Sequence, residues 1–92
     1  MFDLTGKRAL VTGSTQGIGE AIAACLAAQH AQVYVHGATS MEKCEATARK
    51  IAGDIHVCLQ DLSALECADS LYRQTGDIDI LVLNASVQYR RA

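Results

Sequence analysis

The chain has 92 residues and a formal net charge of −2, which leaves no electrostatic footprint for nucleic acid or an anionic membrane. A chain of this length makes at most one domain, and no apolar run is long enough to cross a bilayer. The four cysteines lack the spacing of a zinc site, so we expect reduced thiols packed as small hydrophobes, which favours a cytoplasmic protein.

The first half of the chain predicts a strand, a helix and a second strand. The first strand covers 8–12, the helix covers 17–29 and the second strand covers 32–36. The helical period places four residues on the face that we expect to pack against a sheet: Ile18, Ile22, Cys25 and Leu26.

A second helix follows, with Ser40 as its N-cap, an end near Ala52 and Gly53 as its stop signal. Its predicted inner stripe is Cys44, Thr47, Ala48 and Ile51.

The second half predicts another strand, helix and strand. The third strand covers 55–59, and the last strand covers 79–84. Between them, Ser63 and Glu66 have the spacing of a capping box for a third helix, which Gly76 ends.

This alternation predicts an α/β fold, namely the first β-α-β-α-β-α-β portion of a doubly wound parallel sheet of the Rossmann type, with strand order 3-2-1-4. The last strand is apolar at every position over 80–83, which is typical of a strand covered on both faces. Its outer edge would be bare if nothing followed. We therefore expect residues 1–92 to be the N-terminal part of one longer domain.

The most informative segment is the glycine turn between the first strand and the first helix, Thr12-Gly13-Ser14-Thr15-Gln16-Gly17-Ile18-Gly19. Gly13 suits the tight turn that leaves the strand, Gly17 lets the backbone approach a ligand, and Gly19 permits close contact between helix and sheet. Backbone N–H groups and the positive end of the helix then face one point, which is the arrangement that binds a pyrophosphate.

The spacing of this turn resembles the T-G-x-x-x-G-I-G cofactor turn of the short-chain dehydrogenase/reductase family. The opening stretch 4–11 is similar to the L-x-G-K start of that family, and 79–86 is similar to its D-I-L-V-N-N-A-G stretch. Two residues depart from the latter stretch, Leu83 at its first asparagine and Ser86 at its glycine. An asparagine there bonds to neighbouring backbone, so Leu83 is expected to loosen that network.

The resemblance implies an NAD(P)-dependent oxidoreductase that reduces a carbonyl or oxidises an alcohol by hydride transfer, with a small-molecule substrate, and commonly a homotetramer. The nearest likeness is to 3-oxoacyl-acyl-carrier-protein reductases. The implied cofactor-binding residues are Gly13, Ser14, Thr15, Gln16, Gly17, Ile18, Gly19, His36, Gly37, Thr39, Asp61, Leu62, Asn84, Ala85 and Ser86.

Two of these residues leave alternatives open. Asp61 follows the third strand, where family members place an acid against adenine, but an acid there would also complement the dipole of the third helix. His36 at the end of the second strand is either a positive charge near the cofactor or an uncharged histidine, and the uncharged form is favoured.

The end of the second strand favours NADP, with NAD as the alternative. An NAD site places an acid there to hold the ribose 2′-hydroxyl, and this chain has none until Glu42. The hydroxyls of Thr39 and Ser40, with a helix N-terminus behind them, suit a 2′-phosphate. Family members that prefer NADP often carry a base at the positions of Gln16 and Ala38, which are uncharged here.

No catalytic residue is predicted. The family uses a serine and a tyrosine four residues before a lysine, and neither Tyr34 nor Tyr72 has a lysine at that spacing, while Tyr89 would need residue 93. A dinucleotide-binding module without catalysis therefore stays as the alternative function. A methyltransferase-like site is disfavoured because it also requires an acid after the second strand.

Overall fold

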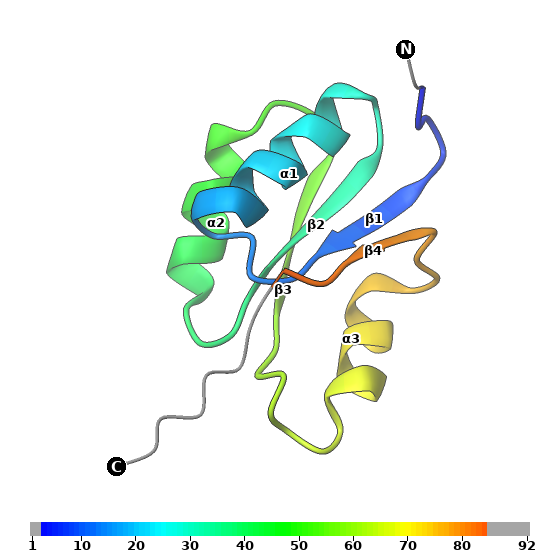
Figure 1. Ribbon diagram of the computed structural model, residues 1–92. Helices are drawn as coiled ribbons and strands as arrows, with labels where there is room; N and C mark the ends of the chain where they lie inside the picture. Colours follow the sequence, from blue (N-terminus) through cyan, green and yellow to red (C-terminus); the bar gives the residue numbers. More distant parts are fainter. Residues whose placement is uncertain (1–2, 85–92) are drawn as a thin grey trace.

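The computed structural model describes residues 3–84, which form a parallel four-stranded sheet flanked by helices (Figure 1). The strand order is β3-β2-β1-β4, and every neighbouring pair is parallel, which confirms the predicted doubly wound α/β arrangement. In chain order the elements are β1 (Arg8–Val11), α1 (Gly17–Ala28), β2 (Gln32–Gly37), α2 (Met41–Lys50), β3 (Ile55–Leu59), α3 (Cys67–Thr75) and β4 (Ile80–Val82).

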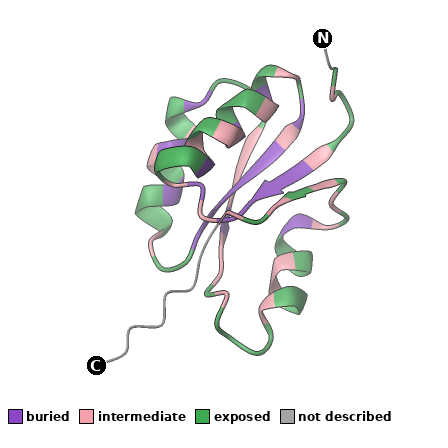
Figure 2. Ribbon diagram, in the orientation of Figure 1, coloured by how far each residue is buried: buried purple, intermediate pink, exposed green. Residues whose placement is uncertain are grey.

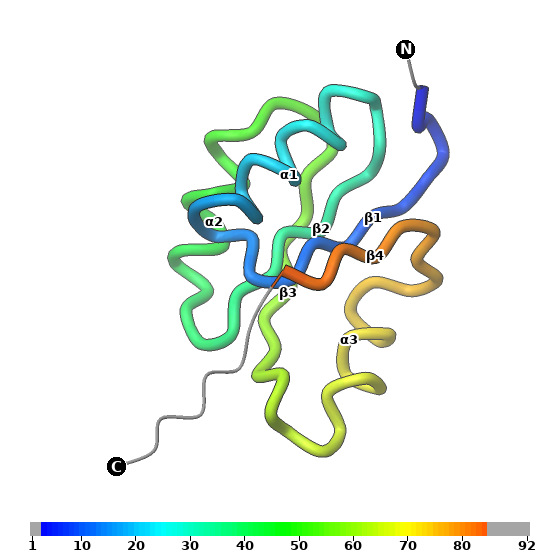
Figure 3. The backbone as a smooth tube through the Cα atoms, in the orientation of Figure 1, coloured from blue at the N-terminus to red at the C-terminus, as the bar shows by residue number. Residues whose placement is uncertain are grey.

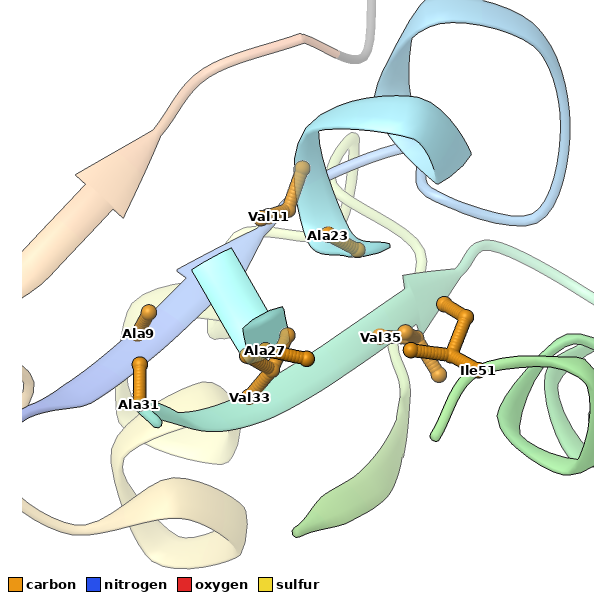
Figure 4. Packing of buried hydrophobic residues seen from close by; sticks show 8 residues of the cluster. All are labelled: Ala9, Val11, Ala23, Ala27, Ala31, Val33, Val35 and Ile51. Atoms are coloured by element: carbon orange, nitrogen blue, oxygen red, sulfur yellow. The ribbon is translucent and has the colours of Figure 1, made fainter. Parts of the chain in front are cut away.

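The main core lies between the sheet and the layer formed by α1 and α2, while α3 lies on the opposite side (Figure 1). Figure 2 shows that buried residues concentrate in β1 and β2, the two central strands. Small and β-branched side chains fill this layer (Figure 4): Ala9, Val11, Ala23, Ala27, Ala31, Val33, Val35 and Ile51.

The buried face of α1 differs from the predicted one. Gly19, Ala23 and Ala27 are buried, whereas Ile18 is 73% exposed and Cys25 is exposed. Residues four apart with little or no side chain let the helix lie close to the sheet, so the contact face is set by small residues rather than by large apolar ones. The predicted residues Ile22 and Leu26 do pack against the core from the flank of that face: both are partly buried there.

The prediction for α2 is confirmed at its start and along its inner stripe. The Ser40 hydroxyl oxygen accepts the N–H of Lys43 at 3.2 Å, which is the N-cap geometry. Cys44, Thr47 and Ile51 are buried, and Ala48 packs against the core. The helix ends at Lys50, before the predicted end, because Ile51 adopts an extended conformation that turns its side chain into the core.

The predicted capping box of α3 is wrong. Both the N–H and the hydroxyl of Ser63 bond to the Asp61 carboxylate, and the helix begins only at Cys67. The N-cap residue, Glu66, makes no side-chain capping bond. A local Asp–Ser turn has therefore taken the serine that the pattern assigned to the helix. Gly76 ends the helix as predicted, at a φ of 73°.

Strand β4 is shorter than predicted and lies at the edge of the sheet. Its residues Ile80 and Val82 pack against the core, but Leu81 on the opposite face is 57% exposed. The outward face of this strand is therefore only partly covered within residues 3–84, and the expectation that elements of a longer domain cover it stays a prediction. No helix within the same residues is both long and apolar enough to span a membrane.

Candidate functional site

The loops that follow the four parallel strands meet at one edge of the sheet. Figure 3 shows the turn after β1 beside the segment that follows β4, although these segments are far apart in the sequence. The loops after β2 and β3 join the same edge, since the N–H of Gln60 bonds to the carbonyl of Gly37 at 3.0 Å. In doubly wound sheets, ligands bind at this carboxyl edge, where the strand order reverses.

The glycine turn has the backbone shape that its sequence predicts. Gly13 and Gly17 adopt positive φ angles of 63° and 61°, a region that L side chains rarely occupy. Helix α1 starts at Gly17, and the side chain of its N-cap residue, Gln16, makes no capping bond. The first-turn N–H groups of a helix have no partner within the helix, so those of α1 are available to a ligand.

One side of the turn is fastened to β2 through Ser14 and His36. The N–H of Ser14 donates to the His36 carbonyl at 3.0 Å, and the N–H of His36 donates to the Ser14 hydroxyl oxygen at 2.6 Å. Ser14 is fully buried. Ser14 was predicted as a cofactor-binding residue, and in the structure its hydrogen bonds hold the turn in place.

The imidazole of His36 supports the turn from beneath. Its Nδ1 accepts the N–H of Gly13 at 2.9 Å, and its Nε2 lies 2.8 Å from the carbonyl oxygen of Gln60. Because Nδ1 accepts the Gly13 N–H and a carbonyl oxygen can only accept, these two bonds fit the uncharged tautomer with its proton on Nε2, the form that the sequence favoured. The residue is 1% exposed, so the geometry makes it a support for the turn rather than a ligand contact.

The other side of the turn is fastened to the end of β4 by Asn84. Its backbone N–H donates to the Thr12 hydroxyl oxygen at 2.9 Å, and its side-chain Nδ2 donates to the Gly13 carbonyl at 3.1 Å. Leu83 is 77% exposed. These two bonds come from Asn84 and not from position 83, so the expected loosening by Leu83 stays a prediction.

Gly19 lies between the turn and Asn84. A Cβ atom at this position would collide with the Gly13 carbonyl oxygen and would lie 2.6 Å from the Asn84 amide nitrogen. The predicted close contact between helix and sheet is confirmed here, and it depends on the absence of a side chain.

A small polar hollow of about 110 Å³ opens beside the turn at the end of β2. Helix α2 helps to shape it, since the Thr47 hydroxyl donates to the Thr15 carbonyl at 3.2 Å. The residues around it are Thr15, Gly37, Ala38, Thr39, Ser40 and Lys43. The sequence analysis did not single out Lys43. Its position three residues after the N-cap serine was a usable signal, because residues three apart on a helix lie close to each other, so Lys43 lies near Ser40 at the start of α2.

Asp61 lies exposed in the loop after β3. Its Oδ1 accepts the Ser63 hydroxyl at 2.7 Å and the Ser63 N–H at 2.9 Å, and these bonds hold the pKa of the carboxyl below its usual value. Helix α3 begins at Cys67, beyond the one-turn reach of a dipole effect, so the dipole alternative for Asp61 has no support. Leu62 is half-buried, and Ala85 and Ser86 lie outside the described residues.

A larger groove of about 620 Å³ lies on the other face of the sheet, between α3 and the strands β1 and β4. Leu10, Leu71 and Leu81 contribute to its apolar wall. No residue of the glycine turn lines it, so it is separate from the candidate site. Among residues 3–84 no group of three or more His, Cys, Asp or Glu side chains is placed to hold a metal ion.

Comparison with known proteins identifies a family whose sequence pattern this chain shares. The chain matches the short chain dehydrogenase family over residues 7–92. The chain belongs to the short-chain dehydrogenase family. The predicted family resemblance is thereby confirmed, and relatives of the chain within this family are oxidoreductases.

Individual relatives cover nearly all of the chain. Nodulation protein G of Rhizobium sp. (strain N33) is 42% identical over 91 residues, which are 95% of this chain and 37% of that protein. The 3-oxoacyl-[acyl-carrier-protein] reductase FabG of Aquifex aeolicus (strain VF5) is 40% identical over 92 residues, covering 91% of this chain and 37% of the reductase.

A solved structure extends the likeness to three dimensions. The crystal structure of a 3-oxoacyl (acyl-carrier-protein) reductase from Agrobacterium tumefaciens C58 with NADP bound matches at a TM-score of 0.86 and 38% identity. The match covers 98% of this chain and 37% of that one. The chain therefore spans a little more than a third of the length of these relatives.

Proposed function

We propose that residues 1–92 form the dinucleotide-binding part of an NAD(P)-dependent short-chain oxidoreductase. The observation that carries the proposal is the uncapped N-terminus of α1, held at the carboxyl edge of the sheet by Ser14, His36 and Asn84. Backbone donors aimed at one point and held rigidly are what a diphosphate requires, because ordering them after binding would reduce the affinity.

The bonds of the turn also indicate which donors face the diphosphate. The N–H of Gly13 is taken by His36, and the N–H of Ser14 is taken by the His36 carbonyl. The donors left to the ligand include the N–H groups in the first turn of α1, which begins at Gly17. Gly17 has no atom within 4 Å of where a Cβ would stand, so the ligand has open access to this backbone.

We further propose NADP as the cofactor, with NAD as the weaker candidate. The loop after β2 has no carboxylate before Glu42 to bind a ribose 2′-hydroxyl or to repel a 2′-phosphate. The hollow at this loop is lined by hydroxyl-bearing and small residues and one lysine. The Agrobacterium reductase named above, which is similar over nearly the whole chain, was solved with NADP bound.

The reaction proposed for the complete protein is reduction of a carbonyl or oxidation of an alcohol by hydride transfer, in the cytoplasm and as a homotetramer. The family supports this reaction, and the cofactor supplies the hydride chemistry when bound. Within the printed sequence no tyrosine is followed by a lysine four residues later, so we assign no catalytic residue to it. The role of residues 1–92 is to bind and orient the dinucleotide.

Calorimetric titration of the intact protein with NADPH, NADH and S-adenosylmethionine tests the proposal. We expect both dinucleotides to bind, NADPH more tightly, and S-adenosylmethionine not to bind. Tighter NADH binding would reverse the cofactor preference, and binding of neither dinucleotide would overturn the proposed function. Dinucleotide binding without turnover across a panel of small ketones and aldehydes would favour the non-catalytic module instead.

A further inference from the structure

The hollow at the end of β2 has a single charged residue in its wall. Lys43 lines it together with five uncharged residues, three of which carry hydroxyl groups. The hollow measures about 110 Å³, whereas pockets that enclose a whole small ligand measure roughly 300–1,000 Å³. It therefore suits one substituent of a larger ligand rather than a complete molecule.

Helix α2 places Lys43 at this hollow. Ser40 caps the helix through the backbone N–H of Lys43, so the lysine is held in the first helical turn, beside the loop that follows β2. Within the described residues the Lys43 ammonium makes no ion pair, whereas Lys50 at the far end of α2 pairs with Glu20 at 3.6 Å. Glu42 precedes Lys43 in the helix but does not line the hollow.

The hollow adjoins the candidate diphosphate site. Thr15 belongs both to its wall and to the glycine turn, and its carbonyl is bonded to Thr47 of α2. In doubly wound folds, a dinucleotide whose diphosphate lies at the first turn places its adenosine ribose at the end of the second strand. The ribose 2′-position then lies next to the hollow.

Resting on the proposed function, we propose that Lys43 is the residue that distinguishes a 2′-phosphorylated adenosine from an unphosphorylated one. The positions where the family often carries a base, Gln16 and Ala38, are uncharged here. A phosphate monoester at the 2′-position carries nearly two negative charges, which need a cation as well as hydroxyl donors. Lys43 supplies that cation from α2, and the hydroxyl of Thr39 supplies a neutral donor.

The experiment measures NADPH and NADH affinities of the intact protein and three variants by calorimetry. Lys43→Met removes the ammonium and keeps the length of the side chain, Lys43→Arg keeps the charge, and Lys50→Met removes an equal charge from the other end of α2. We expect Lys43→Met to weaken NADPH binding about 10-fold to 100-fold and to change NADH binding less than about twofold. Lys43→Arg and Lys50→Met should each leave the NADPH to NADH ratio within about threefold.

A variant at an independent position guards against a folding artefact. Thr39→Asp places a carboxylate at the same hollow and should reverse the preference towards NADH without changing the thermal midpoint of unfolding. Equal weakening of both cofactors by Lys43→Met, or no weakening of either, would overturn the role of Lys43 while leaving the proposed function intact. Failure of the unmodified protein to bind either dinucleotide would overturn both.

Discussion

The Nδ1 atom of His36 accepts the backbone N–H of Gly13 at 2.9 Å, across 23 positions of sequence. The same ring reaches the carbonyl of Gln60 through Nε2, so one side chain of β2 ties together the loops after β1 and β3. This relationship makes the glycine turn part of a rigid edge. It also removes one N–H from the set that a ligand can use.

Replacing His36 by alanine tests this support. His36→Ala leaves the Gly13 N–H and the Gln60 carbonyl without their partner and opens a cavity in a fully packed position. We expect the free energy of unfolding to fall by about 3 kcal/mol, measured by urea denaturation. His30→Asn is the matched control, because His30 is exposed and its φ of 74° suits asparagine, and it should change stability by less than about 0.5 kcal/mol. Equal effects of the two changes would contradict the assigned role.

Adding one methyl group at Gly19 should displace the glycine turn. The Cβ of Gly19→Ala would overlap the Gly13 carbonyl oxygen and crowd the Asn84 side chain. We expect a loss of about 1 to 3 kcal/mol in stability and at least a tenfold loss in dinucleotide affinity, measured by denaturation and calorimetry. Ala24→Ser on the exposed face of α1 serves as the control. Unchanged affinity in Gly19→Ala would show that the turn tolerates the displacement.

Removing the side chain of Asn84 should loosen the turn from β4. Asn84→Ala deletes the bond from Nδ2 to the Gly13 carbonyl but keeps the backbone bond to Thr12. We expect a loss of about 1 kcal/mol in stability and faster amide exchange in the turn, read by hydrogen exchange. Leu83→Ala, at the exposed neighbouring position, should leave the exchange rates unchanged. A larger increase in exchange rates for Leu83→Ala than for Asn84→Ala would contradict the role assigned to the Asn84 side chain.

We expect the buried thiol of Cys58 to lower the stability of the folded protein at alkaline pH. Burial raises its pKa from 9.0 to about 11, so the folded protein holds this proton where the unfolded chain releases it. The unfolded state then binds fewer protons, and stability decreases as the pH rises through the window from 9 to about 11. We expect a slope near −1 kcal/mol per pH unit from this group, measured as the urea midpoint against pH. Cys58→Ala should have a shallower slope, and an identical slope would contradict the assignment.

The order of the elements was open to prediction because it depends on local patterns. Alternating apolar runs and helical periods predict the seven elements, and the handedness of parallel crossovers then leaves few arrangements, of which the observed β3-β2-β1-β4 is one. Glycines at 13, 17 and 19 also predict their own roles, since a positive φ or a missing Cβ is a property of the residue itself.

The tertiary structure decided which face of α1 packs against the sheet. Ile18 and Cys25 fit the helical period of α1, but the sheet selects the face made of Gly19, Ala23 and Ala27 because only small residues allow so close an approach. Such a choice depends on the partner surface, which is distant in sequence and leaves no mark in the local pattern.

By itself, the sequence determined that a strand, a glycine turn and a helix follow one another in the arrangement that binds a diphosphate. Only the folded chain decided that His36 and Asn84 hold that turn and that Lys43 lies beside it. The physical reason is that a turn's shape follows from its own residues, whereas hydrogen bonds across 23 and 71 positions exist only once the strands have been brought side by side.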